Sequence, residues 1–67
     1  MLFIDWDKIP KGFDWAIQDY DGCIKAFNER PYSVYEDGWQ SENGRYIFIA
    51  WGRINRNWRS TIVKRPK

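Results

Sequence analysis

Residues 13–28 read FDWAIQDYDGCIKAFN, and this stretch decides the fold of the chain. Phe13, Trp15 and Ile17 alternate with polar or small residues, which is the period of a half-buried strand. Asp21-Gly22 is a hairpin-turn dipeptide, so residues 23–28 are expected to return as a second strand. Residues 13–28 therefore predict an antiparallel β-hairpin.

A second turn signal lies in Ser41-Glu42-Asn43-Gly44, where Asn-Gly is again a hairpin dipeptide. It introduces Arg45–Trp51, the most β-prone segment of the chain. Both faces of this segment are largely apolar, so we expect it in the centre of a sheet. Gly52–Asn57 is expected to be a connecting loop, and Trp58–Arg65 a last strand.

The remaining segments are short or ambiguous. Residues 32–39 combine a strand-like start with the turn residues Glu36-Asp37-Gly38. Near the N-terminus, Asp5 is suited to cap a helix that Pro10 cuts to about one turn. The sequence thus predicts a single, mainly β domain over residues 1–67. We expect an antiparallel meander sheet of four or five strands, which either curls into a partial barrel or leaves one face open.

Size and composition restrict the classes of function. A chain of 67 residues buries only about 60% of its unfolded surface. One cysteine permits no internal disulfide, and the lack of histidine excludes a standard zinc site. The thirteen aromatic side chains are too many to be buried completely, so some are expected in an exposed contact patch. An acid at position 5 and the lack of a long apolar run favour a soluble cytoplasmic protein without a membrane span.

Charge is segregated along the chain. Residues 1–44 hold all nine acids and four bases, a net charge of −5, whereas residues 45–67 hold seven bases and no acid. Such segregation bears on partners and association rates. If the two halves meet in space, however, their charges simply neutralise each other and contribute little to stability.

The basic half interleaves arginine with tryptophan, which suits phosphate or carboxylate recognition together with ring stacking. The candidate partner-binding residues are Trp51, Arg53, Arg56, Trp58, Arg59, Lys64 and Arg65. In an extended strand, Arg59 and Arg65 would share one face with Thr61, and Trp58 and Lys64 the other. A solvated edge strand, protected by its charges from aggregation, is the other interpretation of this segment.

The acidic half offers an alternative contact face. Its candidate residues are Asp19, Asp21, Glu36 and Asp37. These carboxylates could imitate phosphates against a basic channel. They also fall in expected turns, where aspartate commonly makes local hydrogen bonds.

Catalysis and metal binding are not favoured. Without histidine there is no Ser-His or Cys-His pair, and the acid before Cys23 would raise rather than lower its pKa. Asp19-x-Asp21-Gly22 resembles the start of a calcium loop, but Arg30 stands where the closing glutamate is needed. We therefore expect no enzyme activity, metal or cofactor.

The motif Asp5-Trp-Asp-Lys-Ile-Pro-Lys-Gly-Phe-Asp-Trp15-Ala, followed by Asp19-Tyr-Asp-Gly22, resembles small uncharacterised tryptophan-rich accessory proteins of tailed phages and prophages. Their loose pattern is W-x-x-I-P-x-G-x-x-W-x-A-x-D-x-(D/N)-G, and the resemblance covers about residues 5–39. It implies action in the cytoplasm of an infected bacterium. Phage proteins of this size are often stoichiometric inhibitors of defence systems, including CRISPR.

The resulting hypothesis is a non-enzymatic phage protein that inhibits a host protein or ribonucleoprotein complex by blocking its surface. The alternative is a small nucleic-acid-binding module that uses the basic and aromatic residues after Glu42. A structural assembly protein is a third possibility. The chain is expected to be a monomer or a weak homodimer.

Overall fold

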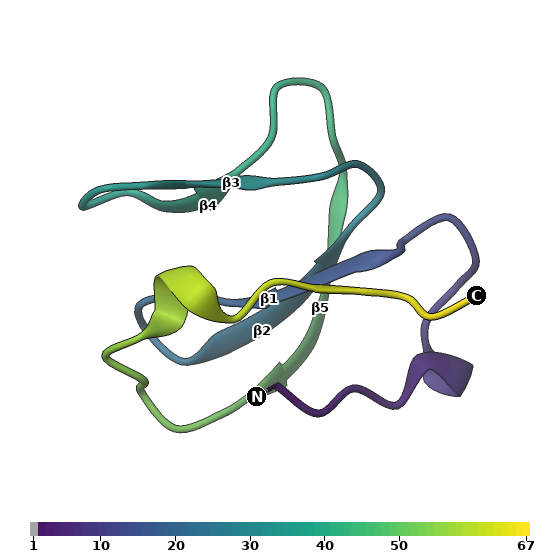
Figure 1. Ribbon diagram of the computed structural model, residues 1–67, viewed down its shortest axis with the longest axis horizontal. Helices are drawn as coiled ribbons and strands as arrows, with labels where there is room; N and C mark the ends of the chain where they lie inside the picture. The colour runs from purple at the N-terminus through teal and green to yellow at the C-terminus, as the bar shows by residue number, and fades with distance from the viewer. Residues whose placement is uncertain (1) are drawn as a thin grey trace.

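Four strands form the main sheet of the protein (Figure 1). The computed structural model describes residues 2–67 and contains β1 (Trp15–Gln18), β2 (Cys23–Phe27), β5 (Tyr46–Trp51) and β6 (Val63–Lys64). The strand order is β5-β2-β1-β6, and each pairing is antiparallel. The β1–β2 pair confirms the hairpin predicted for residues 13–28.

A separate hairpin of β3 (Tyr32–Val34) and β4 (Gly38–Gln40) lies beside the main sheet (Figure 1). It settles the ambiguous stretch 32–39 as two short strands, joined by a turn in which Glu36 has a φ of +76°. The predicted turn at residues 41–44 does not form a hairpin, because β4 and β5 belong to different sheets. It is a link between two layers.

The core lies where β3–β4 meets the main sheet. Ile17 of β1, Phe27 of β2 and Trp39 of β4 form a buried cluster, and Trp15, Trp58 and Ile62 pack against it. The indole N–H of Trp39 donates to the carbonyls of Gln18 and Trp58, at 3.1 Å each. A single tryptophan thus contributes both apolar area and the hydrogen bonds that position β4.

Two predictions about the second half of the chain are wrong. Arg45–Trp51 was expected in the centre of the sheet, but β5 is an edge strand. Trp58–Arg65 was expected to be one strand, yet Trp58–Ser60 forms the 3-10 helix η2 and only Val63–Lys64 is extended. The hydroxyl of Thr61 donates to the carbonyl of Trp58 and accepts from the backbone N–H of Gln18. These bonds favour the helical turn, so the predicted alternation of faces does not exist.

The other features agree with the mainly β prediction. The described residues form six strands, and their only helices are two 3-10 turns. The first, η1 (Trp6–Lys8), is capped by the carboxylate of Asp5 as predicted. The sheet does not follow meander order, because β6 returns beside β1, and it is not closed into a barrel. Within residues 2–67 there is no helix with the length and apolarity that crossing a membrane requires.

The sheet order also changes the meaning of the charge segregation. The basic half supplies β5 and β6, and these strands flank the acidic hairpin β1–β2 on both sides. Strands from the two halves of the chain are therefore neighbours in one sheet, and the halves do not form two separate lobes. The strands of this sheet carry only Lys25 and Lys64 as charged residues, so the remaining charges lie in turns, loops and terminal segments.

Candidate interaction surface

Strand β5 carries three exposed aromatic side chains, Tyr46, Phe48 and Trp51, which we call the aromatic row. Tyr46 lies opposite Phe27, and Phe48 lies opposite Lys25. Directly opposed residues in an antiparallel pair share a face. The aromatic row therefore continues the core face of the sheet beyond the part that β3–β4 covers.

A β-bulge at Ile49 places Trp51 in this row. The pairing of Phe48 with Lys25 is followed by the pairing of Ala50 with Ile24, so Ile49 is an extra residue. Without the extra residue, Phe48 and Trp51 would point to opposite faces, because they are three positions apart. With it, their ring centroids lie 5.7 Å apart.

The aromatic row is accessible and lies along an open edge. Tyr46 is 56% exposed, Phe48 53% and Trp51 67%, so more than half of each side chain faces solvent. Within residues 2–67, no strand pairs with the outer side of β5. Residues 46–51 contain neither charge nor proline, the usual protections of an edge strand. This surface has the character of a contact site.

A hollow of about 300 Å³ lies at the Tyr46 end of the row. Its apolar walls are Phe27, Trp39 and Tyr46, and the link between β4 and β5 forms its polar side. The ring of Phe27 lies 5.4 Å from that of Tyr46, and the ammonium of Lys25 lies 4.8 Å above the Tyr46 ring. An apolar side chain of a partner would find both a flat surface and a recess here.

The predicted basic residues do not form one cluster. Arg53 and Arg56 are exposed in the loop that follows the aromatic row. Lys64 lies on β6, at the opposite edge of the sheet from Trp51, with its ammonium 5.2 Å from the Trp15 ring. Arg53 and Arg56 therefore follow the row in the chain and Arg45 precedes it, while Lys25 of β2 lies against the Tyr46 ring.

Arg65 makes intramolecular contacts with most of its side chain. Nε donates to Oδ1 of Asp14 at 2.7 Å, and the terminal nitrogens donate to the carbonyls of Trp6, Ile9, Pro10 and Phe13. Its guanidinium also lies 4.8 Å from the Trp6 ring. These hydrogen bonds hold the N-terminal segment, so most of the Arg65 guanidinium is engaged within the chain and little of it is free for the partner contact predicted from the sequence.

Trp58 and Arg59 belong to a cluster at the β3–β4 tip. Trp58 packs on the core, with an edge-to-face contact of 6.1 Å to Tyr20. The Arg59 guanidinium lies 4.3 Å from the Tyr35 ring and 5.3 Å from the Trp58 ring. Trp58 is thus a core residue with a partly exposed edge. It is not the free stacking platform that the sequence indicates.

Asp19 is buried, contrary to its predicted place on an acidic contact face. Only 4% of it is exposed. Its carboxylate accepts from the backbone N–H of Trp39 and Tyr20 and from the ammonium of Lys25, at 3.1–3.2 Å. Asp19 joins the β1–β2 turn to β4, so its role is structural.

The other predicted acids are exposed and lie at one end of the molecule. Asp21 sits in the β1–β2 turn, where its carboxylate accepts from the N–H of Cys23. Glu36 and Asp37 sit in the β3–β4 turn. Gly38, at the end of this turn, contacts the carboxylate of Asp19, so the β3–β4 turn lies close to the β1–β2 turn. Of the predicted acidic residues, Asp21, Glu36 and Asp37 therefore remain exposed, in two turns that also lie near the Arg59 guanidinium over Tyr35.

Two pKa shifts describe the chemistry near β2. Burial raises the pKa of the Cys23 thiol. The positive charge of Lys25 opposes this rise, and the negative charges of Asp21 and Asp19 add to it. Burial alone would lower the pKa of Lys25, but the hydrogen bond and charge of Asp19 raise it overall. Cys23 is thus a protonated thiol with little nucleophilic character, and Lys25 remains charged. Among residues 2–67, no three cysteine or acidic side chains are grouped as metal ligands.

Sequence reasoning missed Tyr46 and Phe48. Tyr46 and Phe48 share one face of the segment 45–51, as the sequence shows. Because the other face of this segment is also apolar, the pattern is equally typical of a central strand, whose residues are covered on both faces. Comparisons with protein-family models, curated proteins and solved structures find no match for this chain.

Proposed function

We propose that this protein acts by binding, without catalysis, and that the aromatic row is its contact with a host protein complex. The observation that carries the proposal is the exposure of Tyr46, Phe48 and Trp51 on an unpaired edge strand. Aromatic side chains are enriched among the residues that dominate binding energy at protein interfaces. In such a complex, the inhibitor would cover a surface of the host assembly and block its use.

The proposed biological setting comes from the resemblance to phage accessory proteins. An inhibitor of a bacterial defence complex needs a stable, stoichiometric interface, and standard interfaces bury about 800 Å² on each partner. The aromatic row, the adjoining hollow and the exposed Arg53 together offer an apolar centre with a charged rim. This composition suits a protein partner.

A nucleic-acid partner is the second candidate, and it is favoured by one observation. Arg53 and Arg56 follow Trp51 directly and are exposed, so a stacking ring and two phosphate contacts lie in one short segment. With Arg45, three basic residues are available for phosphate contacts. For single-stranded nucleic acid they predict a slope of about −2 when the logarithm of the binding constant is plotted against the logarithm of the salt concentration. Salt titration of oligonucleotide binding tests this candidate directly.

The main test uses variants of the aromatic row. Affinity purification from nuclease-treated bacterial lysate is expected to recover a stoichiometric protein partner with the natural chain and to lose it with Tyr46→Ser/Trp51→Ser. Phe3→Ser is the matched control, because Phe3 is 91% exposed and lies outside the row. Recovery that is independent of the aromatic row would disprove the proposed interface. Recovery of nucleic acid alone before nuclease treatment would favour the second candidate.

A further inference from the structure

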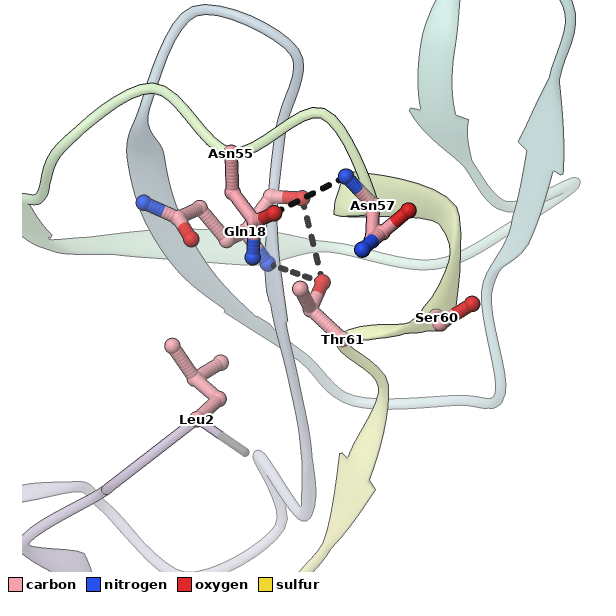
Figure 2. Close-up of a pocket in the computed structure, with 6 residues that line it drawn as sticks. All are labelled: Leu2, Gln18, Asn55, Asn57, Ser60 and Thr61. Carbon is pink, nitrogen blue, oxygen red and sulfur yellow. Dashed lines mark hydrogen bonds between the residues drawn. The ribbon is translucent and has the colours of Figure 1, made fainter.

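A second hollow, of about 210 Å³, lies between β1, the η2 region and the N-terminal segment (Figure 2). It contains no residue of the aromatic row, so a ligand bound here would serve a role separate from the proposed function and independent of it. The side chains that line it carry no charge. They are Leu2, Gln18, Asn55, Asn57, Ser60 and Thr61.

Gln18 is held in one orientation by the backbone. It is only 6% exposed, and its Nε2 donates to the carbonyls of Gly22 at 3.2 Å and of Arg53 at 2.7 Å. Because a carbonyl can only accept, the nitrogen of this carboxamide has to face the backbone. The hydrogen bonds among residues 2–67 leave Oε1 as an acceptor at the pocket.

Asn55 is held in the complementary orientation. Its Oδ1 accepts from the backbone N–H of Asn57 at 2.8 Å. The oxygen is thereby engaged, and the hydrogen bonds of the described chain leave Nδ2 as a donor at the pocket. Figure 2 shows the side chains of Gln18 and Asn55 on the wall of the pocket that faces Leu2.

Thr61 completes the floor but offers no further hydrogen bond of its own. Its hydroxyl accepts from the N–H of Gln18 and lies within hydrogen-bond distance of the carbonyls of Gln18 and Trp58. The half-buried Leu2 contributes an apolar wall. The pocket therefore combines one oriented acceptor, one oriented donor and an apolar surface.

We propose that this pocket binds a small neutral molecule that carries a primary carboxamide. The N–H of the ligand amide donates to Oε1 of Gln18, and its carbonyl accepts from Nδ2 of Asn55. The rest of the ligand lies against Leu2. A carboxylate ligand fits poorly, because it cannot donate to Gln18 and no basic side chain among residues 2–67 lines the pocket to balance its charge.

The probes are nicotinamide and nicotinate, which share one ring and differ in the amide. In heteronuclear NMR titrations of the isotope-labelled chain, nicotinamide is expected to shift the resonances of Gln18, Asn55 and Thr61 saturably. For a ligand of so few atoms, a dissociation constant on the order of 1–10 mM is expected. Nicotinate at neutral pH is expected to produce no saturable shift at these residues.

Asn55→Asp removes the donor and keeps the acceptor for the N–H of Asn57. It is expected to weaken nicotinamide binding about tenfold, as the loss of one hydrogen bond predicts. Asn28→Asp is the matched control, because Oδ1 of Asn28 likewise accepts a backbone N–H, that of Arg45 at 2.7 Å, outside the pocket. Its affinity is expected to stay within about twofold of the natural chain.

Four results would overturn the site. They are the lack of a saturable shift with nicotinamide, equal shifts with nicotinate, shifts centred on the aromatic row, and unchanged affinity in Asn55→Asp. If Asn55→Asp does not fold, Leu2→Ala takes its place and is expected to weaken binding by removing the apolar wall. Unchanged binding in that variant would equally contradict the proposal.

Discussion

Arg65 and Asp14 form an ion pair between the two ends of the chain, with Nε of Arg65 2.7 Å from Oδ1 of Asp14. Of the ion pairs among residues 2–67, it is the one that joins the acidic half to the basic half. The same guanidinium bonds to backbone carbonyls between Trp6 and Phe13. The C-terminal segment thus holds the N-terminal segment through one side chain.

Arg65→Lys is expected to lower the free energy of unfolding by about 2–3 kcal/mol, because an ammonium cannot replace the planar fork that reaches these acceptors together. Urea denaturation measures the change. Arg56→Lys, in the exposed loop, is the control and is expected to stay within about 0.5 kcal/mol. Equal effects of the two substitutions would contradict the structural role of Arg65.

Asp19→Asn is expected to destabilise the fold by about 1–3 kcal/mol. Asparagine can still accept from the N–H of Trp39, but Lys25, whose side chain is 21% exposed, would lose its counter-charge. Asp21→Asn keeps the acceptor for the N–H of Cys23 in an exposed turn and is expected to be nearly neutral. Chemical denaturation of the two variants side by side tests the difference.

Gly38→Ala and Gly12→Ala separate backbone strain from lack of space. Both glycines have positive φ, +86° and +97° respectively, so alanine strains both by about 1 kcal/mol. A Cβ at Gly38 would also collide with the carboxylate of Asp19, whereas at Gly12 it would meet open space. We expect Gly38→Ala to lose at least about 2 kcal/mol more than Gly12→Ala. Similar melting temperatures would contradict the close packing of β4 on Asp19.

Trp58→Ala and Trp51→Ala are expected to differ in the property they change. Trp58 packs on the core, so its truncation is expected to cost about 2–3 kcal/mol of stability. Trp51 is 67% exposed, and its truncation is expected to change stability by less than about 1 kcal/mol while weakening partner binding. Thermal unfolding, measured beside the affinity purification, separates the two roles. A large stability loss in Trp51→Ala would show that the aromatic row is structural.

Stability is expected to fall at alkaline pH. The thiol of an unfolded chain ionises near pH 8.5, whereas burial raises the pKa of Cys23 in the folded chain. Between the pKa of the unfolded thiol and the higher pKa of the folded thiol, the native state binds more protons than the unfolded state, so the free energy of unfolding decreases as pH rises. The stability is fully present below the pKa of the unfolded thiol.

Cys23→Ala is expected to flatten this pH dependence. The comparison concerns the slope of the unfolding free energy against pH, because truncation lowers the absolute stability at every pH. An equal slope in both chains would assign the alkaline loss to other groups. The raised pKa of Lys25 acts in the same direction, but only above about pH 10.

Local chemistry in the sequence was sufficient for the first hairpin. The alternation of Trp15 and Ile17 and the Asp21-Gly22 turn determine two strands that are close in sequence, and the structure confirms them. Asp5 as a cap of one helical turn is confirmed for the same reason. Within the candidate surface, the sequence named Trp51 and Arg53 as candidate partner-binding residues, and both are exposed in the structure.

Long-range packing decided the rest. A sequence pattern does not specify which strand becomes an edge: the two apolar faces of residues 45–51 predict a central strand, whereas β5 is an edge strand with Tyr46 and Phe48 exposed. Nor does it show which charges are used internally: Asp19 and Arg65 became structural because partners distant in sequence supply their hydrogen bonds. The period-two pattern and the turn dipeptides thus determined that this is a β protein. The strand order, which depends on contacts between distant segments, determined which of its aromatic and charged side chains remain available to a partner.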